Sequence, residues 1–270
     1  RFFESYEGTL LRLFYNDINS KWYLSTHRKL DARNSFWGSQ ETFSSRFNSI
    51  ISEEDYDKLD KNYYYMFLIT PNKNNRIVCN NNLNKVIHVG TYDKNFNLSY
   101  DYDVMVQRPN EYIFKNYEEF KLAVESVDIN SLQGIIVSNI NTQTNIKILN
   151  SQYKKLSDIR GNTASIKFRY LELRCDKEKK MLLYNLYPES IKVFEEYEEI
   201  LIQIVNNIFF NYIKRFIRHQ YTTVSPEEYK IMKDCHNWHK LDKENNKITK
   251  GKVIEILNNQ TAVHLNRLIK

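Results

Sequence analysis

The sequence is poor in glycine, proline and cysteine, and it contains no long apolar run. Among its 270 residues are 6 Gly, 4 Pro and 3 Cys. The cysteines at 79, 175 and 235 form no Cys-x-x-Cys pair, so we expect free thiols in a reducing compartment. No apolar stretch approaches the roughly 18 residues that cross a bilayer, and the charged first residues lack a signal-peptide pattern. These absences predict a cytoplasmic protein without a membrane partner.

Two catalytic signatures are also missing, the glycine-rich phosphate loop and the Gly-x-Ser-x-Gly motif. The chain does contain 41% hydrophobic residues and carries a formal net charge of +6. A chain of this length can bury a sizeable core, as one large domain or as two. Its positive charge favours an anionic partner, such as nucleic acid or a nucleotide, over an acidic protein surface.

A β-hairpin is predicted between Glu4 and Asp31. Two stretches rich in apolar and aromatic residues flank the polar run 16–21, which supplies the turn. The first strand opens with Glu7-Gly8-Thr9, and the second ends in His27-Arg28-Lys29. A carboxylate and glycine at one end with cations at the other suit a phosphate-bearing ligand. The alternative is an exposed hairpin with solvated charges.

The rest of the chain divides into a β-rich part and a helical part. We expect a helix start at Ser52 and a helix over 117–126. Strands are predicted over 63–70, 76–79, 86–89, 133–137 and 145–149. From 181 onward the apolar period becomes helical, with helices from 188 to about 219, from 226 to about 238, and from 252. The predicted class is α+β, with a β-rich domain at 1–180 and a helical domain at 181–270.

The segment 33–47 combines Phe36, Trp37 and Phe43 with two arginines, Arg33 and Arg46. Aromatic rings beside arginines are suited to stacking on nucleic-acid bases. The other interpretation is that these rings close the edge of the hydrophobic core.

Four short motifs follow one another along the predicted β-rich part. They are Ser5-Tyr6-Glu7-Gly8; Met66-Phe67-Leu68 with Pro71 and Asn75-Arg76-Ile77-Val78; Gln133-Gly134-Ile135-Ile136-Val137; and Lys147-Ile148-Leu149 with Tyr153. In order and spacing this set resembles the covalent nucleotidyltransferase superfamily, which includes polynucleotide ligases and mRNA capping enzymes. The resemblance is closest to single-strand RNA ligases of the bacteriophage type and to ligase-like proteins of large DNA viruses.

The resemblance implies a nucleotidyltransferase domain of the ATP-grasp-like ligase type, built from two packed antiparallel sheets. It also implies a nucleotide ligand (ATP or GTP), Mg²⁺ as a cofactor, and RNA as a partner. A viral source would place the protein in the host cytoplasm or the virion. In the family, a lysine attacks the α-phosphate of the nucleotide and holds it through a phosphoramide bond.

Several catalytic positions depart from the family pattern. Ser5 stands at the nucleophilic lysine, and Glu7 replaces the family aspartate. Met66 and Gln133 replace glutamates that bind metal and ribose, and Leu149 replaces a second lysine. Serine cannot form the phosphoramide, and a thioether offers no oxygen to Mg²⁺. We therefore expect a pseudoenzyme that retains a ligand cleft but contains no metal-binding residues. The residues expected to bind the nucleotide are Glu7, Gly8, His27, Arg28, Lys29, Gln133 and Lys147.

Two other functions remain open. Lys29-Leu30-Asp31-Ala32 is also Lys-x-Asp followed by a small residue, so Lys29 is a candidate nucleophile in an active RNA ligase or nucleotidyltransferase. The third hypothesis is an interaction scaffold that retains only the fold.

Two further groups of residues have either a functional or a purely structural interpretation. Cys235, His236 and His239 are candidate zinc ligands, or they pack and form surface hydrogen bonds. The basic residues that follow the last motif strand either line the cleft or face solvent; they are Lys154, Lys155, Arg160, Lys167 and Arg169.

Overall fold

The computed structural model describes all residues from 1 to 270. The chain forms two compact units, Arg1–Ala164 and Ser165–Lys270. The division lies earlier in the chain than the expected one after residue 180, because helices 166–173 and 177–186 belong to the second unit. None of the helices is both long and apolar enough to span a membrane.

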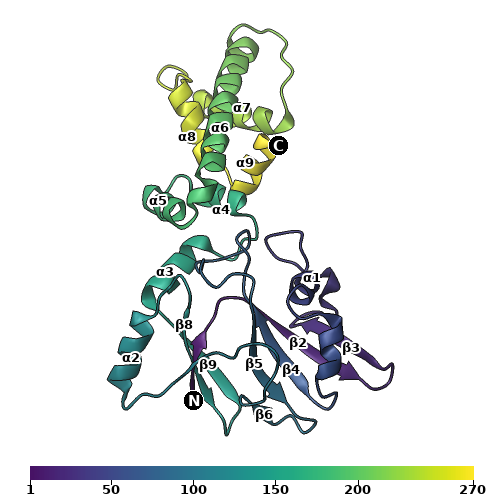
Figure 1. The fold of residues 1–270 in the computed structure, drawn as a ribbon. Helices are drawn as coiled ribbons and strands as arrows, with labels where there is room; N and C mark the ends of the chain where they lie inside the picture. The colour runs from purple at the N-terminus through teal and green to yellow at the C-terminus, as the bar shows by residue number, and fades with distance from the viewer. The chain divides into compact units, whose positions relative to one another are not determined.

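The first unit contains two antiparallel sheets (Figure 1). The four-stranded sheet has the order β7 (Glu111–Tyr112), β1 (Phe2–Ser5), β8 (Gly134–Asn139), β9 (Thr144–Leu149). The five-stranded sheet has the order β3 (Lys21–Thr26), β2 (Thr9–Asn16), β4 (Tyr64–Ile69), β5 (Val86–Tyr92), β6 (Leu98–Ser99). The mixed class with two antiparallel sheets is therefore confirmed, and so is the hairpin formed by β2 and β3.

β1 is a separate strand that the sequence analysis did not separate from the hairpin. It lies in the four-stranded sheet, where Ser5 pairs with Gly134 of β8. The chain crosses to the other sheet through the short link 6–8 and continues as β2. This crossover places the first motif at the junction between the two sheets.

The core of the first unit lies under one face of the five-stranded sheet. In β4, Tyr65, Phe67 and Ile69 are buried, while Met66 and Leu68 face the opposite side. Helix α1 (Phe43–Asn48) and a 3₁₀ turn (Glu53–Lys58) add to this core. The expected helix start at Ser52 is confirmed as a capping box, but it opens that 3₁₀ turn and no α-helix.

Two helices accompany the four-stranded sheet (Figure 1). Helix α2 (Tyr117–Ser126) has the expected bounds and contacts β8, and helix α3 (Ser151–Arg160) follows β9. Asn150 caps α3 and donates hydrogen bonds from its amide to the carbonyl oxygens of Val124 and Glu125. One side chain thus joins the start of α3 to the end of α2.

The second unit consists of helices α4 (Ile166–Leu173), α5 (Lys177–Leu186), α6 (Ile191–Tyr212), α7 (Pro226–Leu241), α8 (Lys250–Asn258) and α9 (Ala262–Ile269). The apolar stripe along α6 is buried, and α7 begins at a full capping box formed by Ser225 and Glu228. α6 ends earlier than residue 219 because a π-helical segment, Ile213–Ile217, follows it.

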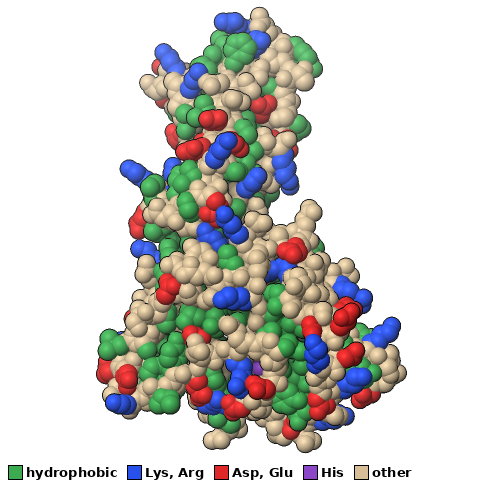
Figure 2. All heavy atoms as spheres, in the orientation of Figure 1, with side chains coloured by type: hydrophobic (Ala, Val, Ile, Leu, Met, Phe, Trp, Pro, Cys, Tyr) green, Lys and Arg blue, Asp and Glu red, His purple; other side chains and the backbone are tan.

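The positive charge is unevenly distributed between the units. Residues 1–164 contain 20 Lys and Arg against 19 Asp and Glu, whereas residues 165–270 contain 19 against 14. Figure 2 shows basic and acidic side chains interspersed over the visible face of each unit. The net charge of +6 is therefore mainly a property of the helical unit.

Candidate functional site between the two sheets

Glu7 anchors the crossover between the sheets. Its carboxylate accepts hydrogen bonds from the backbone N–H groups of Ile77, Val78 and Cys79, and from the Tyr153 hydroxyl at 3.0 Å. The side chain is 5% exposed. This carboxylate explains why 76–79, expected as a strand, is irregular: three of its N–H groups point at Glu7 instead of a neighbouring strand.

Gly8 follows at a point where the backbones come very close. A Cβ atom at this position would collide with the Ile69 carbonyl oxygen and would lie 2.8 Å from a methyl group of Leu68. Only glycine therefore allows the crossover to lie against the end of β4.

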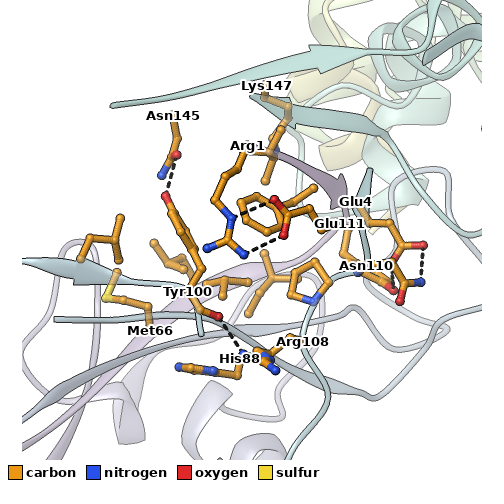
Figure 3. A pocket seen from close by; sticks show the side chains of 18 of the residues that line it. Arg1, Glu4, Met66, His88, Tyr100, Arg108, Asn110, Glu111, Asn145 and Lys147 are labelled. Carbon is orange, nitrogen blue, oxygen red and sulfur yellow. Dashed lines mark hydrogen bonds and ion pairs between the residues drawn. The ribbon is translucent and has the colours of Figure 1, made fainter. Parts of the chain in front are cut away.

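A cavity of about 680 Å³ opens between the two sheets (Figure 3). Six residues of the four motifs line it: Tyr6 and Gly8 near the crossover, Met66 and Leu68 of β4, Ile136 of β8 and Lys147 of β9. Apolar side chains of the five-stranded sheet form one wall, and Tyr100 bridges to the other sheet through hydrogen bonds to Ser138 at 2.6 Å and Asn145 at 3.0 Å. Residues from all four motifs, which are distant in the sequence, thus lie together around one cavity.

Lys147 is the one lysine that lines this cavity, and it has no carboxylate within ion-pair distance. Its ammonium donates a hydrogen bond to Oε1 of Gln133 at 3.1 Å, and the Gln133 amide donates in turn to the Tyr6 carbonyl oxygen. Removal from water lowers the pKa of Lys147, while the negative charge of Glu7 partly opposes this effect. Lys147 is nevertheless exposed, so the cavity presents a solvent-accessible cation without a carboxylate partner.

The other cations of the cavity already have partners. Arg1 pairs with Asp101 at 2.8 Å and with Glu111 at 2.7 Å. Arg108 lies 3.7 Å from Asp103, and it donates to the Tyr100 carbonyl oxygen at 3.2 Å. Figure 3 shows Arg1 and Glu111 facing each other inside the cavity. Lys147 is consequently the cation most available to an incoming anion.

His88 forms part of the cavity wall and is 1% exposed. Its Nε2 lies 2.8 Å from the Thr91 hydroxyl, and its Nδ1 has no partner. Burial lowers the pKa of His88 to about 4, so the ring is neutral at pH 7. It offers the cavity a hydrogen-bonding group without charge.

The remaining predicted residues are distributed unevenly. Ser5 is fully buried with its Oγ unpartnered, and it does not line the cavity. His27, Arg28 and Lys29 form an exposed turn after the edge strand β3 and do not line this cavity. The Lys29 ammonium donates to the Asn34 carbonyl oxygen at 3.0 Å, and Asp31 caps the turn Ala32–Asn34.

The candidate zinc ligands and the basic stretch after the last motif strand both include residues that pack or pair within the protein. Cys235 is fully buried, and His236 stacks on Phe216 with ring centroids 4.0 Å apart. No group of three His, Cys, Asp or Glu side chains is arranged to hold a metal. Of the basic stretch, Arg160 is 1% exposed and donates to backbone carbonyls, while Arg169 pairs with Glu172 at 2.8 Å.

The motif positions do not fit Mg²⁺. Met66 presents sulfur, the oxygen of Gln133 accepts the Lys147 ammonium, and the oxygens of Glu7 already accept four hydrogen bonds. Magnesium requires oxygen ligands in a nearly octahedral arrangement. We therefore assign no metal to this cavity.

Residues 88–111 contribute much of the cavity and were missed by the sequence analysis. His88, Tyr100 and Arg108 lie outside the four motifs, and the loop that carries the last two is irregular. A strand over 86–89 was predicted from the sequence, but nothing in it indicated which residues of that strand border the cavity.

No protein-family model matches the chain. Two curated iridovirus proteins are similar to it, each named "Immediate-early protein ICP-46 homolog". The one from Invertebrate iridescent virus 3 is 31% identical over 224 residues, which are 78% of this chain and 48% of that protein. The one from Invertebrate iridescent virus 6 is 26% identical over 307 residues, covering 99% of this chain and 66% of that protein. The chain thus spans between about half and two thirds of their length, and neither name states a ligand or an activity.

The Glu7 carboxylate is predicted to be essential for stability. Glu7→Gln replaces one acceptor oxygen with an N–H donor that faces other donors, so we expect the free energy of unfolding to fall by roughly 2–5 kcal/mol. Tyr153→Phe removes only one of the four donors, and roughly 1–2 kcal/mol should be lost. Urea unfolding followed by tryptophan fluorescence measures both changes. Equal losses for the two variants would contradict this role.

Acid should destabilise the protein through His88. Its ordinary pKa of 6.5 falls to about 4 on folding, so the unfolded state binds more protons between these values. Stability is therefore complete above about pH 6.5 and decreases by roughly 3 kcal/mol as the pH falls to 4. In His88→Gln, whose amide can still bond Thr91, this part of the acid loss should disappear. An unchanged acid profile for the variant would exclude His88 as its source.

Proposed function

We propose that residues 1–164 form an RNA-ligase-like nucleotidyltransferase domain that binds a nucleotide without forming a covalent intermediate. The observation that carries this proposal is the convergence of Gly8, Met66 and Lys147 on one cavity of about 680 Å³. These residues come from distant parts of the sequence but from positions that bind the nucleotide in the family that the chain resembles. The volume is typical of small-molecule sites, which measure roughly 300–1,000 Å³.

The arrangement suits binding better than catalysis. The Lys147 ammonium, positioned by Gln133, would bind a phosphate group, and the apolar wall formed by Leu10, Met66 and Leu68 would receive the base. Ser5 has no amine and does not border the cavity. Residue 5 therefore supplies no nucleophilic amine, and its side chain is not placed to reach a ligand in this cavity.

Two observations weaken the alternative in which Lys29 is the nucleophile. Its ammonium is bound to the Asn34 carbonyl oxygen, and the turn that carries it lies after the edge strand β3. The scaffold hypothesis requires no ligand cavity and predicts no nucleotide binding, so a binding measurement distinguishes it from our proposal. Because both similar proteins are viral, we propose the host cytoplasm or the virion as the location.

Lys147→Ala should weaken nucleotide binding at least tenfold, since it removes a charge-assisted hydrogen bond to phosphate. Fluorescent ATP and GTP analogues measure the affinity. Lys147→Arg retains the charge and should bind within a few-fold of the wild type. Because the lowered pKa of Lys147 lies below 10.5, wild-type binding should decrease in the alkaline range, whereas binding by Lys147→Arg should persist.

The same samples are incubated with α-labelled ATP or GTP and Mg²⁺ or Mn²⁺, and then run on a denaturing gel. We expect no label on the wild type. A label that survives denaturation would overturn the pseudoenzyme proposal, and its loss in Lys29→Ala would identify that lysine as the nucleophile. Unchanged affinity in Lys147→Ala would remove the cavity as the nucleotide site.

RNA binding is a second candidate function, and the observation that favours it is the charge excess of the helical unit. The π-helical segment after α6 carries Lys214 and Arg215, and Arg218 follows it directly. Alanine at these three positions should lower RNA affinity. The slope of log K against log salt concentration should become less steep, by the equivalent of about two to three phosphate contacts. Filter binding between 50 and 200 mM salt measures this, with Lys147→Ala as the control. An RNA affinity that does not change with salt concentration would refute this function.

A further inference from the structure

A second cavity, of about 370 Å³, also borders Gly8. Its walls include the aromatic residues Phe36, Trp37 and Phe43 together with Arg46. These are the aromatic and arginine residues of segment 33–47, for which base stacking and core packing were both open. Phe43 is 8% exposed and belongs to the core, whereas Phe36 is 60% exposed.

Arg46 is a buried cation without an anion. It is 4% exposed, its one hydrogen bond runs from Nη2 to the Thr70 carbonyl oxygen, and its Nε has no partner. No carboxylate lies within ion-pair distance, and removal from water lowers its pKa, an effect that Glu41 only partly opposes. A guanidinium carries five donors, and leaving a buried charge uncompensated is strongly unfavourable. The side chain therefore lacks an anionic acceptor.

Trp37 is held in place beside this cation. The Asn75 amide donates to the Trp37 carbonyl oxygen at 3.2 Å, and the Arg160 guanidinium lies 5.2 Å from the centre of its ring. Gly38, which follows, has a φ of +71°, a conformation suited to glycine. An aromatic ring fixed in advance loses little entropy when a second flat ring packs against it.

Glu7 also lines the second cavity but does not neutralise Arg46. Its oxygens are directed to the N–H groups of 77–79 and to Tyr153. Thr9 and Asn162 also border the cavity; Thr9 is partly buried and Asn162 is exposed. They are available to bond the edge of a ligand ring.

We propose that this second cavity binds a nucleoside monophosphate, with the phosphate at Arg46 and the base against Trp37. The rings supply a stacking surface, Arg46 supplies the missing charge compensation, and Thr9 and Asn162 supply hydrogen bonds. The volume of about 370 Å³ lies at the small end of ligand sites. This site is separate from the cavity of Lys147 and does not depend on a ligand there.

The test uses the full chain carrying Lys147→Ala, so that the first cavity contributes little. Titration calorimetry with 5′-AMP should detect one site, and the fluorescence of Trp37 should change on binding. Inorganic phosphate, which has no ring, should bind at least tenfold more weakly than AMP. The nucleoside adenosine, which has no anion, should also bind at least tenfold more weakly.

Arg46→Met in the same background should weaken AMP binding at least tenfold, and Trp37→Leu several-fold. Arg46→Lys guards against a folding defect, because it retains the charge without the forked donors and should bind with intermediate affinity. Circular dichroism confirms that each variant is folded. Full AMP affinity in folded Arg46→Met would overturn the proposal, and so would phosphate binding as tight as AMP binding. The absence of AMP binding to the Lys147→Ala chain with Arg46 intact would also overturn it. A loss caused by Lys147→Ala alone would instead place the bound AMP in the first cavity.

Discussion

The carboxylate of Glu7 is the interaction on which the arrangement of the first unit depends. It connects the crossover between the sheets, the segment 77–79 and helix α3 through Tyr153. These three parts are far apart in the sequence, and a single buried group joins them. Without an acceptor there, three backbone N–H groups and a hydroxyl would lose their partner in a region closed to water, which is more unfavourable than the loss of ordinary hydrogen bonds.

This role also limits what Glu7 can do chemically. A carboxylate that accepts four hydrogen bonds has little capacity left for a metal or for a substrate hydroxyl. The Glu7 side chain thus stabilises the crossover that shapes both cavities, and each cavity borders Gly8.

The sequence predicted the elements whose patterns are local. The hairpin β2–β3, strands β4, β5, β8 and β9, helix α2 and the Ser225 cap follow from alternation, helical period and capping. β1 was missed because four residues carry almost no periodic signal, and 76–79 was wrongly expected as a strand because its N–H groups bind a side chain 70 residues away. The family resemblance predicted one cleft that Glu7, Gly8, Gln133 and Lys147 would share. Gly8 and Lys147 line the first cavity, whereas Glu7 and Gln133 do not. His88 and the buried state of Arg46 were not predictable, because both depend on packing between distant segments.

The distribution of charge matches the two kinds of ligand that we propose. A nucleotide pocket needs few charges in fixed positions, and the nearly balanced first unit places one uncompensated cation in each cavity, Lys147 and Arg46. Binding a nucleic-acid backbone instead depends on the number of cations, because each neutralised phosphate releases counterions. The helical unit carries that excess. Isolated cations in cavity walls therefore give selectivity for one small anion, while a dispersed surface excess gives affinity for a long polyanion.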